Sequence, residues 1–144
     1  MEITTVTRQN QPHKVFTRDK IAEFLYQHLD EFGDPKQDIL SCYDYAMENG
    51  FGGFACVAHE GDEILGVTII NETGMGGFIP ENILVYIAVD AKTRGKGVGK
   101  KLMQTAIEAA NGDIALHVEP NNPAKFLYEK LGFTNKYLEM RYKK

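Results

Sequence analysis

The stretch ILVYIAVDAKTRGKGVGKKL, residues 83–102, joins an apolar run to a basic, glycine-rich loop and then to a helical pattern. The run that ends at Val89 is apolar at both alternating positions, which is typical of a strand buried on both faces. Apolar residues then recur at helical spacing from Val98 to Ala110. Strand, glycine turn and helix in this order commonly bind phosphate, because the first N–H groups of a helix lack intrahelical partners.

The spacing of the glycine loop decides which phosphate motif it represents. A Walker A loop needs glycine at position 94 and serine or threonine at position 101, where this chain has Arg94 and Lys101. A dinucleotide fingerprint would place its third glycine at Lys100 or at Leu102. Both motifs are therefore disfavoured, and the pattern that remains is R-x-x-G-x-G, beginning at Arg94.

Two helices are predicted upstream of the strand. Thr17 is a suitable N-cap for the first, whose apolar residues recur at helical spacing. In the second, Asp34 is a suitable cap, Pro35 fits the first helical position, and the buried stripe reaches Met47 before Gly50 ends the helix.

Strand patterns fill the region between these helices and residue 83. Residues 53–70 are rich in β-branched side chains and predict an antiparallel hairpin that turns at Gly61 and Asp62. Residues 71–82 contain three glycines and a proline, and they predict an exposed, mobile loop.

The last third of the chain predicts a further strand, a helix and a short ending. Residues 114–119 read as the strand, and Asn122 and Pro123 then begin a helix that buries Phe126, among others, and stops at Gly132. Residues 133–144 predict two short closing strands. Strands 83–89 and 114–119, with the helix between them, should form a parallel pair with a right-handed crossover. The chain is thus expected to form a single mixed α/β domain over residues 1–144.

Composition limits the classes of function. With 43% hydrophobic and 25% charged residues, a net charge of -4 and a pI near 5.6, the chain does not resemble a nucleic-acid binder, which would carry a basic face. Cys42 and Cys56 match neither a disulfide framework nor a metal-ligand spacing. No segment resembles a signal peptide or a membrane span. We expect a cytoplasmic protein with reduced thiols, no metal, and no nucleic-acid or membrane partner.

A second pattern lies downstream of the glycine loop. It is N-x-x-A-x-x-x-Y-x-x-x-G-F, given by Asn121, Ala124, Tyr128, Gly132 and Phe133. Together the two patterns resemble the GNAT superfamily of N-acetyltransferases, whose acetyl-CoA pyrophosphate loop has the form R-x-x-G-x-G. The resemblance covers residues 57–133 in element order, and the N-terminal helices by position only. It implies a GNAT-like mixed sheet with two N-terminal helices, in which the two parallel strands splay apart to admit the cofactor.

The resemblance also implies roles for individual residues. The glycines let backbone N–H groups approach a diphosphate, and freed backbone groups near Ile87 and Val89 would pair with the pantetheine arm and stabilise the developing oxyanion. Tyr128 matches the family's general acid, which protonates the leaving thiolate. The alternatives are a solvated helix face for the lysines and an ordinary core position for Tyr128. The expected cofactor-binding residues are Ile87, Val89, Arg94, Gly95, Lys96, Gly97, Val98, Gly99, Lys100, Asn121, Ala124, Lys125 and Tyr128.

No fixed spacing identifies the general base. The candidates are Glu72, Glu81, His117 and Glu119, of which Glu72 and Glu119 are retained, although each also fits an ordinary surface or strand position. His28 lies on an apolar helix face and is interpreted as a core histidine. An acidic, aromatic rim that suits a cationic amine is expected from Tyr26, Asp30, Glu31, Phe32, Asp34, Tyr43 and Tyr45, but helix packing explains the same residues.

The predicted function is direct transfer of an acetyl group from acetyl-CoA to a primary amine of a small molecule or protein, in a ternary complex and without metal. The alternative is a non-catalytic acyl-CoA sensor or regulatory module. Tyr128 favours the enzyme, whereas the absence of a definite base keeps the sensor open. The acceptor, the acyl-chain preference, the pathway and the oligomeric state also stay open, although short C-terminal strands would offer an edge through which two copies could pair.

Overall fold

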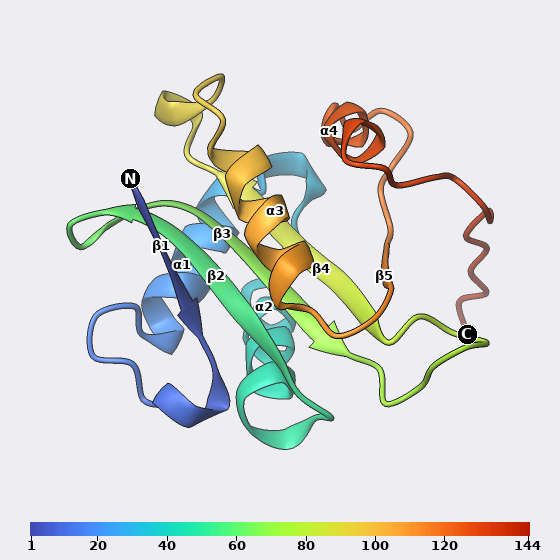
Figure 1. The fold of residues 1–144 in the computed structure, drawn as a ribbon, viewed down its shortest axis with the longest axis horizontal. Coiled ribbons are helices and arrows are strands. Elements are labelled where there is room, and N and C mark those ends of the chain that lie inside the picture. The colour runs from blue at the N-terminus through green and yellow to red at the C-terminus, as the bar shows by residue number, and fades with distance from the viewer.

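The computed structural model describes residues 1–144 and places one five-stranded sheet between two layers of helices (Figure 1). Neighbouring strands are antiparallel, except that β4 and β5 are parallel. None of the helices is both long enough and apolar enough to cross a membrane. In sheet order the strands are β1 (Glu2–Val6), β2 (Gly53–Glu60), β3 (Glu63–Glu72), β4 (Asn82–Val89) and β5 (Ile114–Leu116), and the helices are α1 (Arg18–His28), α2 (Lys36–Asp44), α3 (Val98–Ala109) and α4 (Ala124–Lys130).

The two N-terminal helices form where their apolar spacing predicts them. Thr17 caps α1 by accepting a hydrogen bond from the Lys20 N–H at 3.2 Å. The predicted cap of α2 is wrong, because Pro35 occupies the N-cap position without a side-chain bond and Asp34 bonds Tyr86 instead. After α2 the chain makes one π-helical turn, Tyr45–Asn49, which ends at Gly50.

Two apolar clusters hold the three layers together. Eighteen buried residues lie between α1, α2 and one face of the sheet. The second cluster has ten buried residues between α3 and the other face, and one of them is Tyr128 of α4. Figure 1 shows α3 in front of the sheet, with α1 and α2 behind it. Opposite faces of the central strands therefore contact different helices.

The strand predictions are confirmed for the hairpin and incomplete at the N-terminus. β2 and β3 are antiparallel and are joined at Gly61, which has φ +55°, and Asp62. β1 was not predicted. It pairs with β2 along one edge of the sheet, and its largely half-exposed polar and β-branched residues give only a weak sequence signal.

A β-bulge at Val85 changes the facing of β4. Ile69 pairs with Tyr86 and Ile70 pairs with Leu84, so Val85 has no partner on β3. Leu84 and Ile87 consequently pack on the α3 side, while Tyr86 packs on the α1 and α2 side. The prediction of a strand buried on both faces is only partly right, because Val85 is 36% exposed.

β4 and β5 pair only briefly and then separate. Their parallel ladder runs from the pair Asn82 and Ile114 to the pair Leu84 and Leu116. Beyond it β4 continues to Val89 beside β3, whereas the other segment leaves the sheet (Figure 1). The splayed pair is therefore present, but the strand predicted over residues 114–119 ends at Leu116 because no neighbour pairs with the residues that follow.

The C-terminal predictions hold for α4 and fail after it. The predicted helix forms as α4 and ends before Gly132, which has φ +100°. The predicted burial of Phe126 is wrong, because this side chain is 65% exposed and Tyr128 is the buried residue of α4. Residues 133–144 form no strand, because no sheet edge pairs with them. Four large apolar side chains of this segment are exposed: Tyr137, Leu138, Met140 and Tyr142.

Candidate functional site

The glycine loop leaves β4 through a short turn and enters α3 in a left-handed conformation. Asp90 begins the turn, since its Oδ1 accepts the Lys92 N–H at 2.9 Å. Gly95 and Gly97 have φ of +84° and +81°, and Gly97 is the N-cap of α3. A Cβ atom at either glycine would meet no atom within 4 Å. Backbone conformation, and not internal packing, therefore requires glycine at these two positions.

The loop presents a run of free backbone donors. The first hydrogen bond of α3 joins the Lys101 N–H to the Gly97 carbonyl at 3.1 Å. None of the N–H groups from Gly95 to Lys100 donates a hydrogen bond within the protein. The side chains of Arg94, Lys96 and Lys100 are exposed around them. Free N–H groups at a helix N-terminus among cations make a site for an anion.

Gly99 has a different role from the other two loop glycines, because it lies inside the first turn of α3. A Cβ atom there would lie 3.4 Å from Leu127 and 3.6 Å from Val89. These are ordinary van der Waals distances, so Gly99 lies against α4 and β4 and neither packing nor backbone conformation requires glycine there.

Backbone groups of β4 face that gap. The Asp90 N–H donates to the Leu65 carbonyl at 2.9 Å, which fixes the phase of the β3–β4 ladder. Hydrogen-bonded and non-hydrogen-bonded pairs alternate in an antiparallel ladder, so the N–H and C=O groups of Ile87 and Val89 point away from β3. β5 no longer pairs with β4 at this level, which leaves these groups available to an extended ligand.

Tyr128 reaches the same region from α4. The residue is only 6% exposed, and burial raises the pKa of its phenol to about 12. Its hydroxyl makes no hydrogen bond within the protein. Every fully buried side-chain oxygen in the protein has a partner, so the Tyr128 hydroxyl is not fully buried and borders open space. The group is therefore a protonated donor at neutral pH and can serve an external acceptor.

The other predicted cofactor-binding residues lie at the two ends of the gap. Asn121 is exposed, and Ala124 and Lys125 lie half-buried in the first turn of α4. Asn122 orders that turn, because its Oδ1 accepts the Ala124 N–H at 3.0 Å. Across the gap, Arg94 lies 3.6 Å from Asp30 of the segment that links α1 to α2.

The structure does not bring the predicted base candidates to the middle of β4. Glu72 pairs with Asn82, at the end of β4 remote from the glycine loop. The adjacent Glu81 accepts the Asp113 N–H at 3.0 Å, and this bond lowers the pKa of its carboxyl. His117 and Glu119 follow β5 and are exposed.

A tyrosine and carboxylate pair that the sequence did not predict occupies the α1 and α2 side of β4. The Tyr86 hydroxyl donates to Asp34 Oδ2 at 2.5 Å. The hydroxyls of two members of the predicted aromatic rim are bonded within the protein, since Tyr43 donates to Gln11 Oε1 and Tyr45 donates to the Glu72 carbonyl. No sequence signal distinguishes Tyr86, because its facing depends on the bulge at Val85.

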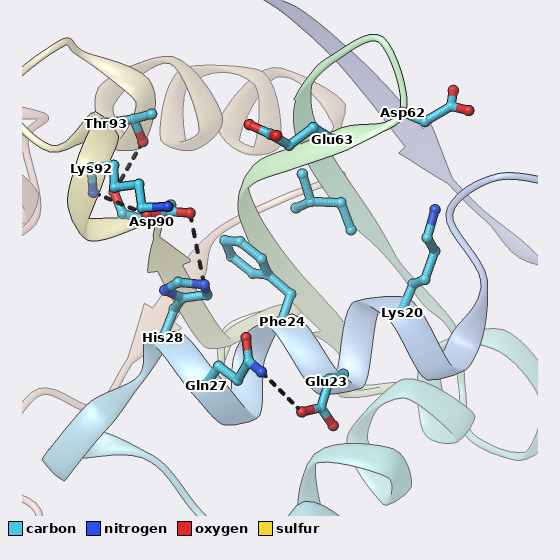
Figure 2. Close-up of a pocket in the computed structure, with 11 residues that line it drawn as sticks. Lys20, Glu23, Phe24, Gln27, His28, Asp62, Glu63, Asp90, Lys92 and Thr93 are labelled. Carbon is cyan, nitrogen blue, oxygen red and sulfur yellow. Dashed lines mark hydrogen bonds and ion pairs between the residues drawn. The ribbon is translucent and has the colours of Figure 1, made fainter.

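A surface cavity of about 430 Å³ lies between α1, the β2–β3 turn and the start of the glycine loop (Figure 2). His28 forms part of its wall, with its ring centroid 4.3 Å from that of Phe24 in a tilted arrangement and its Nε2 3.9 Å from Asp90 Oδ2. The predicted core histidine is therefore partly exposed. Only Phe24 and Ile64 supply apolar lining, unlike most small-molecule sites. We assign this cavity no ligand.

Comparison with known proteins bears on both the fold and the site. Residues 52–135 match the family model described as an acetyltransferase (GNAT) domain. No curated protein matches the chain. The fold is similar to that of the aminoglycoside N-acetyltransferase AAC(6')-Iy in complex with CoA, with TM-score 0.70, 16% identity, and 99% and 93% of the two chains covered.

Two further solved structures share the fold. One is the ribosomal-protein-alanine N-acetyltransferase of Brucella melitensis, with TM-score 0.65 and 17% identity over 99% of each chain. The other is a transcriptional regulator of Bacillus halodurans, with TM-score 0.68 and 18% identity over 99% of each chain. At these identities the similarity establishes the fold alone.

Proposed function

The chain belongs to the GNAT acetyltransferase family, and we propose that it transfers an acetyl group from acetyl-CoA to a primary amine by direct attack in a ternary complex. The proposal treats residues 1–144 as one catalytic domain that needs no metal.

The free N–H groups from Gly95 to Lys100 carry the proposal. Coenzyme A combines a diphosphate with a long arm that bears amides. The loop offers donors for the diphosphate, and the exposed backbone groups of Ile87 and Val89 offer partners for the amides. Arg94, Lys96 and Lys100 add charge around the loop, while Asn121, Ala124 and Lys125 would contact the same molecule from α4.

The chemistry divides between the cofactor and the protein. Bound acetyl-CoA supplies the thioester whose acetyl group is transferred. A backbone N–H near Ile87 or Val89 would donate to the carbonyl oxygen as negative charge develops there. The Tyr128 hydroxyl would donate its proton to the leaving sulfur, because it is protonated at neutral pH and has no hydrogen-bond partner within the protein. Neither cysteine is needed, and burial raises the pKa of Cys42 to about 12.

Calorimetry with CoA and acetyl-CoA tests the cofactor assignment, with ATP and NAD as controls. We expect binding of both CoA compounds and of neither nucleotide; the reverse result would remove the assignment.

A panel of amines then tests the reaction. Because the structural neighbours include enzymes named for aminoglycosides and for a ribosomal-protein alanine, the panel comprises kanamycin, an alanine-initiated tripeptide, lysine and spermidine. Release of free thiol should exceed the rate without amine for at least one of them. Binding of acetyl-CoA with flat thiol release across the panel would contradict the enzyme and favour a sensor.

A further inference from the structure

We propose that Asp34 accepts the proton of the acceptor's ammonium group and that Tyr86 positions its carboxylate for that step. The inference rests on the proposed acetyl transfer, and it assigns the base that the sequence left open.

The position of Tyr86 on β4 is the first observation. It directly follows the bulge at Val85 and directly precedes Ile87, whose backbone faces the gap between the parallel strands. Its side chain packs on the α1 and α2 side, whereas Tyr128 packs in the cluster on the α3 side. The two tyrosine side chains therefore lie on opposite faces of the sheet. A donor for the leaving sulfur and an acceptor for the amine proton can thus act without competing for one position.

The bond between Tyr86 and Asp34 is the second observation. Tyr86 is 7% exposed, and its hydroxyl holds Asp34 Oδ2 at 2.5 Å across a sequence separation of 52 residues. Oδ1 of Asp34 has no hydrogen bond, and the residue is exposed. One carboxylate oxygen is thereby anchored to the strand while the other stays free for an ammonium group, and the proton it receives can pass to solvent.

The surroundings of Tyr86 keep its hydroxyl in the protonated form that donates to Asp34. Burial, and then the hydrogen bond and charge of Asp34, raise the pKa of the Tyr86 phenol well above its usual range, so it remains a donor. Cys42 and Asp38 of α2 are the other titratable groups close to Tyr86. Burial raises the pKa of the Cys42 thiol to about 12, which leaves it neutral. Further along the linker, the charge of Asp30 is paired with Arg94.

The proton and electron balance of the step is complete with these groups. The ammonium N–H bond breaks and an O–H bond forms on Asp34. The nitrogen lone pair then forms the C–N bond, the C–S bond breaks, and the sulfur takes its proton from Tyr128. The nitrogen loses a second proton to water, which leaves a neutral amide. Asp34 returns its proton to water, and Tyr128 is reprotonated from water, so no oxidant or further reactant is required.

The first test compares the pH profiles of the wild type, Asp34→Asn and Asp38→Asn with the panel amine that gives the highest wild-type thiol release. Loss of a general base should lower kcat/KM of Asp34→Asn about 100-fold or more at pH 7. The deficit should shrink as pH rises through the pKa of that amine, about 8 for an α-amino group and about 10.4 for a lysine side chain, because the neutral amine needs no base. A purely structural role would give a deficit that is constant with pH.

Asp38→Asn is the matched control, because it removes an equal charge near Tyr86 without removing the anchored carboxylate. We expect its kcat/KM to stay within about threefold of the wild type, as for a solvent-screened charge. Tyr86→Phe keeps the ring that fills the core and loses only the anchor. It should lower kcat/KM about 3- to 30-fold and show part of the same pH dependence.

Binding supplies a readout that does not depend on turnover. In calorimetric titrations of the same amine into protein saturated with CoA, Asp34→Asn should weaken amine binding at least tenfold. The affinity for CoA itself should be unchanged in all three variants. Equal effects of Asp34→Asn and Asp38→Asn, or a deficit independent of pH, would overturn the inference while leaving acetyl transfer intact. Failure of the wild type to bind CoA would instead remove the proposed function.

Discussion

Replacement of Gly97 by alanine tests the central claim about the glycine loop. Gly97 has φ +81° and is the N-cap of α3, within a run of N–H groups that have no partner in the protein. A Cβ atom there would meet no protein atom within 4 Å, so the internal cost is conformational and amounts to about 1–2 kcal/mol. For a domain of this size that corresponds to a decrease in Tm of about 2–8 °C.

The Gly97→Ala substitution should also weaken CoA binding, in addition to its conformational cost to folding stability. The loop can relieve the strain by rotating its peptide groups, and the new methyl group occupies space in front of the free donors. A hydrogen bond to a charged group contributes about 1.5–3 kcal/mol. Loss of a single such bond would therefore weaken CoA binding about 10- to 150-fold, since each 1.4 kcal/mol is a factor of about ten.

Gly61→Ala is the matched control for this experiment. Gly61 also has a positive φ, +55°, and a Cβ atom there would likewise meet nothing within 4 Å, but it lies in the β2–β3 turn. Thermal melts should show similar destabilisation of the two variants, and calorimetry should show weaker CoA binding only for Gly97→Ala. The donor cradle would be refuted if CoA affinity stayed within threefold of the wild type in Gly97→Ala, or fell equally in both.

Three other predictions concern the acid, the core and the thiols. In Tyr128→Phe, the Tm should stay within about 2 °C of the wild type and the CoA affinity should be unchanged, because the Tyr128 hydroxyl makes no hydrogen bond. The kcat in thiol-release assays should fall about 10²- to 10⁴-fold, and an unchanged kcat would exclude the acid role. Leu102→Ala, at a fully buried position of α3, should lower the free energy of unfolding by about 2–5 kcal/mol in urea titrations, and a loss below about 1 kcal/mol would contradict its core position. Burial raises the pKa of Cys42 to about 12 and of Cys56 to about 11, so at pH 8 fewer than about one thiol in a thousand is ionised, and iodoacetamide should label both only after denaturant is added; rapid labelling of the native protein would show that the thiols are accessible.

Sequence patterns predicted the elements that are specified by residues close together in the chain. Thr17 predicted the start of α1, the turn at Gly61 predicted the hairpin, and Arg94, Gly97 and Gly99 predicted the loop that leads into α3. Each of these signals is local, because a cap, a turn or a helix N-terminus is specified by residues within one or two turns.

Features that depend on distant partners were not predictable in the same way. Residues 133–144 alternate like a strand, but alternation specifies only one apolar face and does not supply a neighbouring edge. Asp34 has the right position and chemistry for an N-cap, yet its carboxylate is taken by a tyrosine 52 residues away. Asp34 also belongs to the acidic rim that the sequence predicts, but residue type and position alone do not distinguish it there as a base, because its contact with Tyr86 depends on the fold.

The bulge at Val85 also affects how this strand should be compared with related sequences. It divides β4 into two segments of opposite phase, so that Leu84 and Ile87, three positions apart, share one face of the sheet. An alignment that shifts the gap by one position across Val85 would exchange the two faces and place Tyr86 among the residues that face α3. Substitutions in the two segments are also subject to different constraints. Residues before the bulge must preserve the pairing with β5, whereas residues after it must preserve the gap between β4 and β5.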